Sequence, residues 1–185
     1  MLCLVCHRVD RSSVCRQCRL SLRPASDRLL GDGIRLIAAF EHTGAARELV
    51  HHLKYRGLID YADLVAAMLA PRIPDLPLVP VPRAFSRRLK YGLDPARVLA
   101  TRLSALTGAP VMPLLGPPLH TRRRAGGDHR SRVPPFRLRG TVPAAVLVVD
   151  DVVTTGATLE SAVHCLGRDR VRTVIAANAV AEGRR

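Results

Sequence analysis

The chain has 185 residues and a net charge of +14, enough length for one domain of ordinary size with a small appendage. Apolar residues make up 48% of it, but aromatic residues only 3% and tryptophan is absent, so we expect a core of Leu, Val, Ile and Ala. The chain has no run of 18 apolar residues, and its first residues lack the pattern of a signal peptide. We therefore expect a cytoplasmic protein that does not span a membrane.

The positive charge is concentrated in one segment of the sequence. Between residues 83 and 139, thirteen Lys or Arg residues stand against two acids, Asp94 and Asp128. A field of this sign favours anionic partners such as nucleic acid, nucleotides or phosphorylated sugars. Of the 29 basic residues 27 are arginines, which suits a GC-rich codon bias as well as phosphate recognition. A solvated basic surface therefore stays an alternative for any single arginine.

Four of the five cysteines lie near the N-terminus in the pattern C-x2-C-x8-C-x2-C. They are Cys3, Cys6, Cys15 and Cys18. Each short C-x-x-C turn directs two thiolates toward one ion, and two such turns complete a tetrahedral Zn–S4 site with no position open for a substrate. We predict a structural zinc ion in a knuckle formed by residues 1–24. The alternatives are a redox dithiol pair and metal-free thiols.

Residues 25–185 alternate between strand-like and helical patterns, which predicts a parallel sheet with helices on its faces. The expected strands are residues 34–44, 76–82, 109–115, 144–151 and 172–181. The expected helices are residues 45–57, 61–71, 94–108 and 156–168. Residues 116–139 are rich in Pro, Gly and Arg without a clear period, which indicates a long functional or mobile loop.

Two of the expected helices carry specific signals. In the helix over residues 45–57, Ala46, Leu49, Val50 and Leu53 recur at the spacing of one buried face, and Gly57 is expected to end the helix. The helix over residues 94–108 has Asp at the N-cap, Pro at the first helical position and Gly at its end.

The stretch VLVVDDVVTTGATLESAV, residues 146–163, combines a buried strand, two adjacent acids, a Thr/Gly turn and a helix. At the carboxyl edge of a parallel sheet, turn amides and a helix N-terminus bind phosphate, and Gly156 allows a close approach. Asp150 and Asp151 then accept hydrogen bonds from vicinal sugar hydroxyls. Additional hydroxyl donors are Thr154, Thr155 and Thr158. The pattern indicates a ribose 5-phosphate site, and the alternatives are a nucleophilic or metal-binding Asp pair or an inert capped turn.

The string VLVVDDVVTTGATL resembles the ribose-phosphate signature of the type I phosphoribosyltransferases. Together with the cysteine knuckles, RELVHHLKYRG and LVPVP, it makes nearly the whole chain resemble the ComF family of competence-associated proteins. The resemblance implies a phosphoribosyltransferase-like α/β fold over residues 25–185. It also implies a catalytic pair, Asp150 and Asp151, that holds the ribose hydroxyls of phosphoribosyl diphosphate.

The resemblance further implies how the rest of this ligand is bound. The 5-phosphate would contact Thr154, Thr155, Gly156, Ala157 and Thr158. The diphosphate would meet Arg83, Arg87, Arg88 and Lys90. Magnesium would arrive on the diphosphate oxygens, as is usual for this hard cation. The arginine-rich residues 122–132 match the mobile loop that closes over the site in this fold.

Three functions follow from these expectations. The first is a magnesium-dependent phosphoribosyltransferase, in which a nitrogen nucleophile displaces diphosphate from C1 of the ribose. The second is a sugar-phosphate sensor in competence or DNA uptake that binds single-stranded DNA. The third is an adaptor whose zinc knuckle docks a helicase. Residues 91–95 read YGLDP where ComF relatives have an RGFNQ-like string, so the acceptor stays open, as does the oligomeric state.

Overall fold

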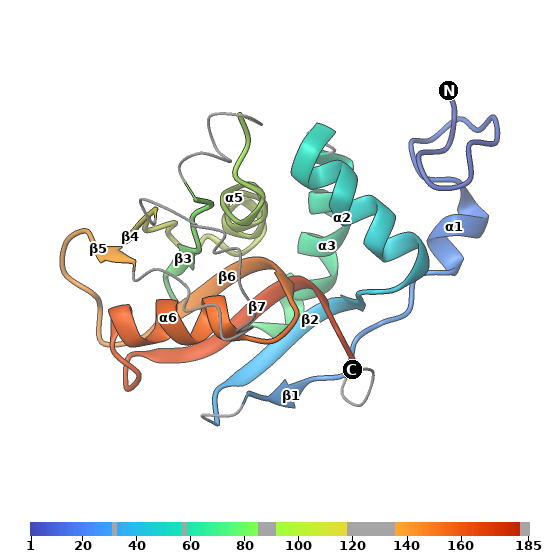
Figure 1. Ribbon diagram of the computed structural model, residues 1–185. Helices are drawn as coiled ribbons and strands as arrows, with labels where there is room; N and C mark the ends of the chain where they lie inside the picture. The colour runs from blue at the N-terminus through green and yellow to red at the C-terminus, as the bar shows by residue number, and fades with distance from the viewer. Residues whose placement is uncertain (31–32, 57–58, 85–91, 118–135, 182–185) are drawn as a thin grey trace, which may run out of the picture.

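The computed structural model describes residues 1–30, 33–56, 59–84, 92–117 and 136–181. A five-stranded sheet in the order β1-β2-β7-β6-β3 forms its centre (Figure 1). The strands are β1 (Arg28–Leu29), β2 (Arg35–Glu41), β3 (Leu78–Pro80), β6 (Val146–Val153) and β7 (Val171–Ala179). Only β1 pairs in an antiparallel sense among these, so the sheet is mostly parallel.

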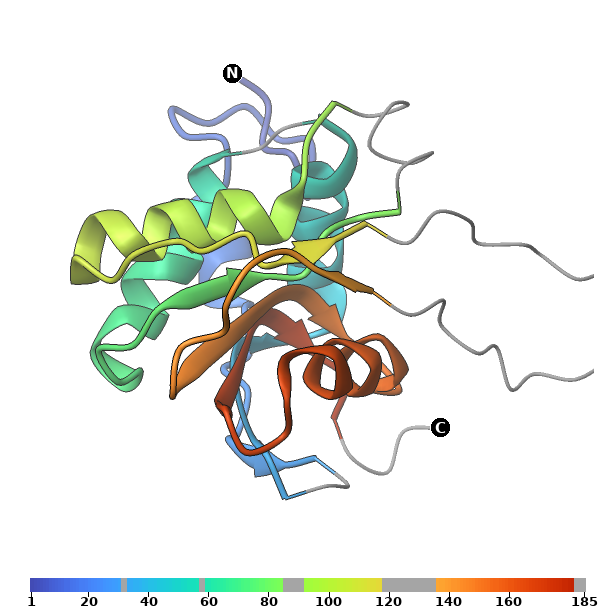
Figure 2. The ribbon, with the colours of Figure 1, turned by 90° about the vertical axis from the view of Figure 1, so that its left-hand side faces the viewer.

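Helices cover both faces of the sheet, as Figures 1 and 2 show. One face is covered by α2 (Gly44–Arg56), α3 (Ile59–Leu69) and α5 (Pro95–Thr107), and the other by α6 (Ala157–Leu166). Neighbouring strand residues alternate between the two cores, with Leu147 in one and Val148 in the other. The predicted α/β fold with a parallel sheet flanked by helices is therefore confirmed.

The two helices with specific signals form close to their predicted bounds. Ala46, Leu49, Val50 and Leu53 are all buried, which confirms the predicted face of α2. Its predicted stop, Gly57, lies outside the described residues. Helix α5 follows Asp94 and ends at Thr107, and its C-cap Gly108 has a φ of 78°, in the left-handed region that favours glycine.

The prediction of a strand over residues 109–115 is wrong. Val111 makes only an isolated parallel bridge to Leu78, because Pro110 and Pro113 on either side have no N–H to donate. The chain instead forms β4 (Leu115–Gly116), which pairs with β5 (Arg137–Leu138) in a two-stranded antiparallel sheet. The two ends of the predicted long loop are therefore strands, and residues 118–135 between them, with the expected mobile loop, lie outside the described part of the chain.

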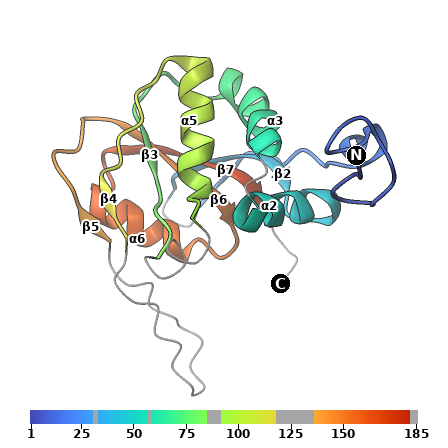
Figure 3. The ribbon, with the colours of Figure 1, turned by 90° about the horizontal axis from the view of Figure 1, so that it is seen from above.

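The N-terminal segment packs beside α2, as Figures 1 and 3 show. It contains the short helix α1 (Arg16–Leu20), and its Leu4 carbonyl lies 3.1 Å from Nε2 of His52 on α2. Cys3, Cys15 and Cys18 belong to the same buried cluster as Leu49 of α2. The division into units 1–24 and 25–185 stays a prediction.

After α3 the chain makes the short 3-10 helix η1 (Ala70–Arg72). None of the described helices has both the length and the apolar content that crossing a bilayer requires.

Candidate functional site

Polar side chains from four parallel strands meet at the carboxyl edge of the sheet. His42 follows β2, Arg83 lies just beyond β3, and Asn178 is the second-last residue of β7. Asp150 and Asp151 lie in the last half of β6. In open α/β sheets this edge is where ligands bind, so the fold places the predicted acids where a binding site is expected.

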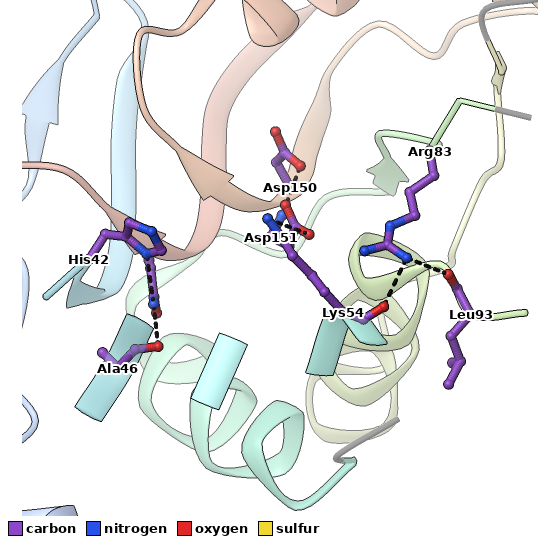
Figure 4. Close-up of polar contacts among 8 residues, drawn as sticks. His42, Ala46, Lys54, Arg83, Leu93, Asp150 and Asp151 are labelled. Carbon is purple, nitrogen blue, oxygen red and sulfur yellow. Dashed lines mark hydrogen bonds and ion pairs between the residues drawn. The ribbon is translucent and has the colours of Figure 1, made fainter. Parts of the chain in front are cut away.

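The two acids lie within β6, as predicted, but the strand runs two residues past its predicted end at Asp151. The strand continues to Val153 because Val152 and Val153 still pair with Asn178 and Ala179 of β7. Asp151 reaches toward α2, where its Oδ2 lies 3.2 Å from the Nζ of Lys54 (Figure 4). Asp150 lines a small pocket with residues 152–159 at the start of α6. The two neighbouring carboxylates therefore point to opposite faces of the sheet, Asp151 toward α2 and Asp150 toward the start of α6.

Asp150 is buried, with 9% of its surface exposed. Its Oδ1 accepts a hydrogen bond of 2.8 Å from the backbone N–H of Asp151. Burial, followed by the charge of Asp151, raises the pKa of the Asp150 carboxyl well above its usual range, although Asp151 N–H and the Lys54 charge act against the rise. This carboxyl therefore holds its proton more readily than an exposed aspartate, while Asp151 has a cationic partner.

The turn after β6 has the geometry of an anion site. Gly156, with φ of 86°, is the N-cap of α6. The first N–H that makes a hydrogen bond within the helix is that of Glu160, which donates to the Gly156 carbonyl at 2.9 Å. The amides of residues 157–159 precede that bond and have no carbonyl within the helix to reach. The hydroxyl-bearing residues Thr154, Thr155 and Thr158 are exposed. Amides and hydroxyls thus surround the pocket that Asp150 also lines.

Arg83, the one described member of the predicted diphosphate group, is held by the backbone. Its Nη1 donates to the carbonyls of Lys54 at 2.9 Å and Leu93 at 3.3 Å (Figure 4). Its guanidinium also lies 5.4 Å from the centre of the Tyr55 ring. It therefore joins the end of α2 to the segment before α5. The other three residues, Arg87, Arg88 and Lys90, lie outside the described part of the chain.

A buried polar network holds α2 and α3 against β7. Asn178 donates to the carbonyl of Ala46 at 2.7 Å, and the Tyr61 hydroxyl donates to Asn178 Oδ1 at 2.5 Å. His42 Nδ1 lies 3.3 Å from the Asn178 amide, and burial, together with the charges of Lys54 and Arg47, lowers the pKa of His42. The network fixes the helix that carries Lys54.

Sequence reasoning missed Lys54, His42 and Asn178. Lys54 lies in RELVHHLKYRG, one of the strings that carried the resemblance, but no spacing in that string indicates that it pairs with an acid almost one hundred residues later. His42 and Asn178 follow or end apolar strands, and that position was the only available signal.

The four N-terminal cysteines form a second cluster. Their sulfur atoms all lie within 4.8 Å of one another, and Cys6 Sγ is 3.7 Å from Cys15 Sγ. Tetrahedral zinc with Zn–S bonds of about 2.3 Å requires sulfurs about 3.8 Å apart, so the spacing fits. Among the described residues no other group of three or more His, Cys, Asp or Glu is placed to hold a metal.

The thiols of this cluster differ in their pKa. All five cysteines of the chain are described, and none forms a disulfide. Backbone N–H groups of Cys15 and Cys18 donate to the sulfurs of Cys3 and Cys15, each at 3.4 Å. Burial acts to raise the pKa of Cys3, but hydrogen bonds from the backbone of Cys15, Cys6 and Val5 lower it to about 6. The thiolate, which is the form that binds metal, is therefore favoured at Cys3. Burial and the neighbouring thiols instead raise the pKa of Cys18.

No protein-family model matches the chain, and no curated protein matches it. Among solved structures it is similar to a purine phosphoribosyltransferase from Pyrococcus horikoshii Ot3. The TM-score is 0.40 and the identity 21%, over 66% of this chain and 73% of that one. At this level of similarity, what the archaeal protein acts on is not carried over to this chain.

Proposed function

We propose that this chain binds phosphoribosyl diphosphate, or a related ribose 5-phosphate, at the carboxyl end of β6. The observation that carries the proposal is that two carboxylates and the turn at a helix N-terminus, which can bind an anion, lie within residues 150–158. Asp150 lines the same pocket as the threonines and glycine of the turn before α6. Thr154, Thr155, Gly156, Ala157 and Thr158 would receive the 5-phosphate, and Asp150 with Asp151 the ribose hydroxyls.

A sugar diol that binds to Asp150 and Asp151 must displace the present partner of Asp151. Asp151 is already paired with Lys54, and only 14% of its side chain is exposed. A sugar hydroxyl that reaches Asp151 therefore competes with the Lys54 ammonium, which would turn toward the diphosphate together with Arg83. Magnesium would enter on the diphosphate oxygens, since this cation is often held by substrate phosphates and few carboxylates. Nothing in the described residues forms a complete magnesium site without the ligand.

Calorimetric titration with phosphoribosyl diphosphate and Mg²⁺ tests the proposal. We expect saturable binding to the wild-type protein and a loss of at least about tenfold in affinity for Asp151→Asn, since the amide keeps the shape but not the charge that accepts the hydroxyls. Asp75→Asn, an exposed site on the loop before β3, is the matched control and should bind like the wild type. Equal affinity in wild type and Asp151→Asn would contradict the proposal.

The chemistry that such a site supports is transfer of the phosphoribosyl group to a nitrogen nucleophile. Cations around the leaving diphosphate and the acids beside the sugar ring would stabilise the charges that develop. A ComF-type role in competence and DNA uptake stays part of this proposal. Single-stranded DNA and a helicase stay predictions, because the arginine-rich residues 122–132 lie outside the described part of the chain.

We further propose that the N-terminal cluster holds a structural zinc ion. Cys3, Cys6, Cys15 and Cys18 supply four sulfurs at a spacing that fits the ion, and such a site leaves no position for a substrate. The metal would fix the fold of the knuckle against α2.

A cytoplasmic location also stays a prediction.

A further inference from the structure

The buried side chain of Asn178 has only one possible orientation. Its Oδ1 accepts a hydrogen bond from the Tyr61 hydroxyl at 2.5 Å, and its Nδ2 lies 2.7 Å from the carbonyl oxygen of Ala46. A backbone carbonyl can only accept, so the atom that faces Ala46 must be the amide nitrogen. Burial raises the pKa of the Tyr61 hydroxyl, so this group keeps the proton that it donates. Both ends of the Asn178 amide are therefore fixed.

This orientation decides which nitrogen of His42 has the proton. The Asn178 amide has two hydrogens, one for Ala46 and one that faces His42 Nδ1 at 3.3 Å. Nδ1 must then accept, so it has no proton of its own, and a neutral imidazole has its single proton on Nε2. Burial, and then the charges of Lys54 and Arg47, lower the pKa of His42 and disfavour a second proton. The network therefore holds His42 as a neutral ring with an Nε2–H group.

The Nε2–H group of His42 is open to a ligand. Among the residues that the structure describes it has no hydrogen-bond partner, and it is not one of the side-chain nitrogens that are buried without one. His42 follows β2 and lies with Asp151 at the carboxyl edge of the sheet (Figure 4). Besides burial, the charges of Lys54 and Asp151 both act on the pKa of His42, so the ring lies close to this ion pair.

A sugar hydroxyl that binds at this edge needs a donor of this kind. A hydroxyl has one proton to donate and lone pairs that accept. Asp151 would receive the proton, because an ionised carboxylate only accepts, and the lone pairs of the hydroxyl would then lack a partner. Lys54 would turn toward the diphosphate in the exchange described above. His42 would donate to the hydroxyl oxygen, and it could not act as a base there, because its Nε2 already has a proton and its Nδ1 faces Asn178.

We propose that Asn178 fixes the tautomer of His42, and that the His42 Nε2–H is a further binding group that donates to a ribose hydroxyl held by Asp151. Asn178 acts only through His42 and is a positioning residue. The binding role rests on the proposed function, whereas the tautomer is measured on the protein without any ligand.

Long-range proton–nitrogen NMR of the full chain, labelled with ¹⁵N-histidine, tests the tautomer. At neutral pH we expect His42 to have a protonated Nε2 and an unprotonated Nδ1. His164, which is exposed on α6, is the internal comparison and should show both tautomers. A protonated Nδ1 of His42 in the wild-type protein would overturn the inference. Asn178→Ala removes the donor to Nδ1 and should allow both tautomers of His42, but the wild-type spectrum decides without it.

Calorimetric titration with ribose 5-phosphate tests the binding role. We expect His42→Ala to lower the affinity by about threefold to tenfold, the usual effect of one neutral hydrogen bond. His42→Gln should keep most of the affinity, because its amide can place an N–H near the position of Nε2. Inorganic phosphate has no sugar and should bind equally to the wild type and to both variants. His164→Ala is the control and should bind ribose 5-phosphate like the wild type.

The outcomes separate this inference from the proposed function. Unchanged ribose 5-phosphate affinity in His42→Ala, beside a loss in Asp151→Asn, would overturn the role of His42 and leave the proposed function in place. An equal loss of affinity for inorganic phosphate in His42→Ala would exclude a hydroxyl contact and overturn that role as well. A wild-type protein that does not bind ribose 5-phosphate would also overturn it. If that protein does not bind phosphoribosyl diphosphate either, the proposed function is wrong too.

Discussion

Asp150 makes the stability of the folded protein depend on pH. Its pKa is raised by burial and by the charge of Asp151, so ionisation of this group favours the unfolded chain. The destabilisation is absent below the unfolded-state pKa of about 3.9 and grows as the pH rises toward the folded-state pKa. Asp150→Asn keeps an oxygen for the Asp151 N–H and removes the charge. We expect it to raise the free energy of unfolding by about 1–3 kcal/mol near neutral pH.

Urea unfolding across a pH series checks this prediction. The advantage of Asp150→Asn should shrink as the pH falls and vanish below about pH 3, because the wild-type carboxyl is then neutral in both states. Asp75→Asn, at an exposed site, should show no such trend. An advantage that is the same at all pH values would mean that packing, and not charge, separates the two proteins.

At the same scale, the sequence predicted those site residues that are neighbours along the chain. Asp150, Asp151 and the turn residues 154–158 are contiguous, so strand, turn and helix signals alone place them together. Lys54 and Asn178 reach the site from other elements, and their contacts depend on the order of strands in the sheet. No local pattern contains that order. The sequence alone could therefore not predict the pairing of Asp151 with Lys54. It also could not predict that a sugar hydroxyl must compete with the Lys54 ammonium for Asp151.

At the scale of the element, the turn into α6 depends on the backbone conformation of Gly156. Its φ of 86° is strained for any residue with a Cβ, although the space around it is open, with the nearest atom 4.0 Å away. We expect Gly156→Ala to lower the free energy of unfolding by about 1–2 kcal/mol and to weaken phosphate binding, because relief of the strain rotates the turn amides.

Gly108→Ala provides a control for Gly156→Ala at a helix-capping glycine of similar backbone conformation, although Gly108 is a C-cap and Gly156 an N-cap. Gly108 ends α5 with φ of 78° and also has open space for a Cβ. Both variants should therefore lose similar stability in chemical denaturation, but only Gly156→Ala should lose affinity for phosphoribosyl diphosphate. Equal effects of the two on ligand affinity would show that the turn has no special role in binding.

Across the whole molecule, alternation of strand and helix patterns was enough to predict a parallel sheet, but not its order or its edges. The apolar residues 109–115 look like a strand, yet prolines at 110 and 113 limit them to one bridge at Val111. The pairing of β4 with β5 joins segments separated by the long loop, and at Gly116 a Cβ would approach the Arg137 carbonyl oxygen of the partner strand to 3.3 Å. Such long-range pairings follow from the assembled fold and not from local periodicity.

The knuckle connects metal binding to the stability of the whole chain. Three of its four cysteines share a buried cluster with Leu49 and Leu53 of α2, the helix that carries Lys54. Because metal binding and folding are coupled in small thiolate sites, Cys15→Ser should lose the zinc ion and lower the free energy of unfolding by about 2–5 kcal/mol. Metal analysis of the purified protein and thermal unfolding measure the two effects.

Cys165→Ser is the matched control for this prediction, because Cys165 lies on α6 and contributes no sulfur to the cluster. It should keep one zinc ion per chain and unfold close to the wild-type temperature. If Cys15→Ser keeps the metal, the four-sulfur site is wrong. If it loses the metal but not the stability, the knuckle folds independently of α2, and the boundary near residue 24 separates two units. A joint loss of metal, stability and phosphoribosyl diphosphate affinity would instead show that the knuckle supports the helix that supplies Lys54 to the site.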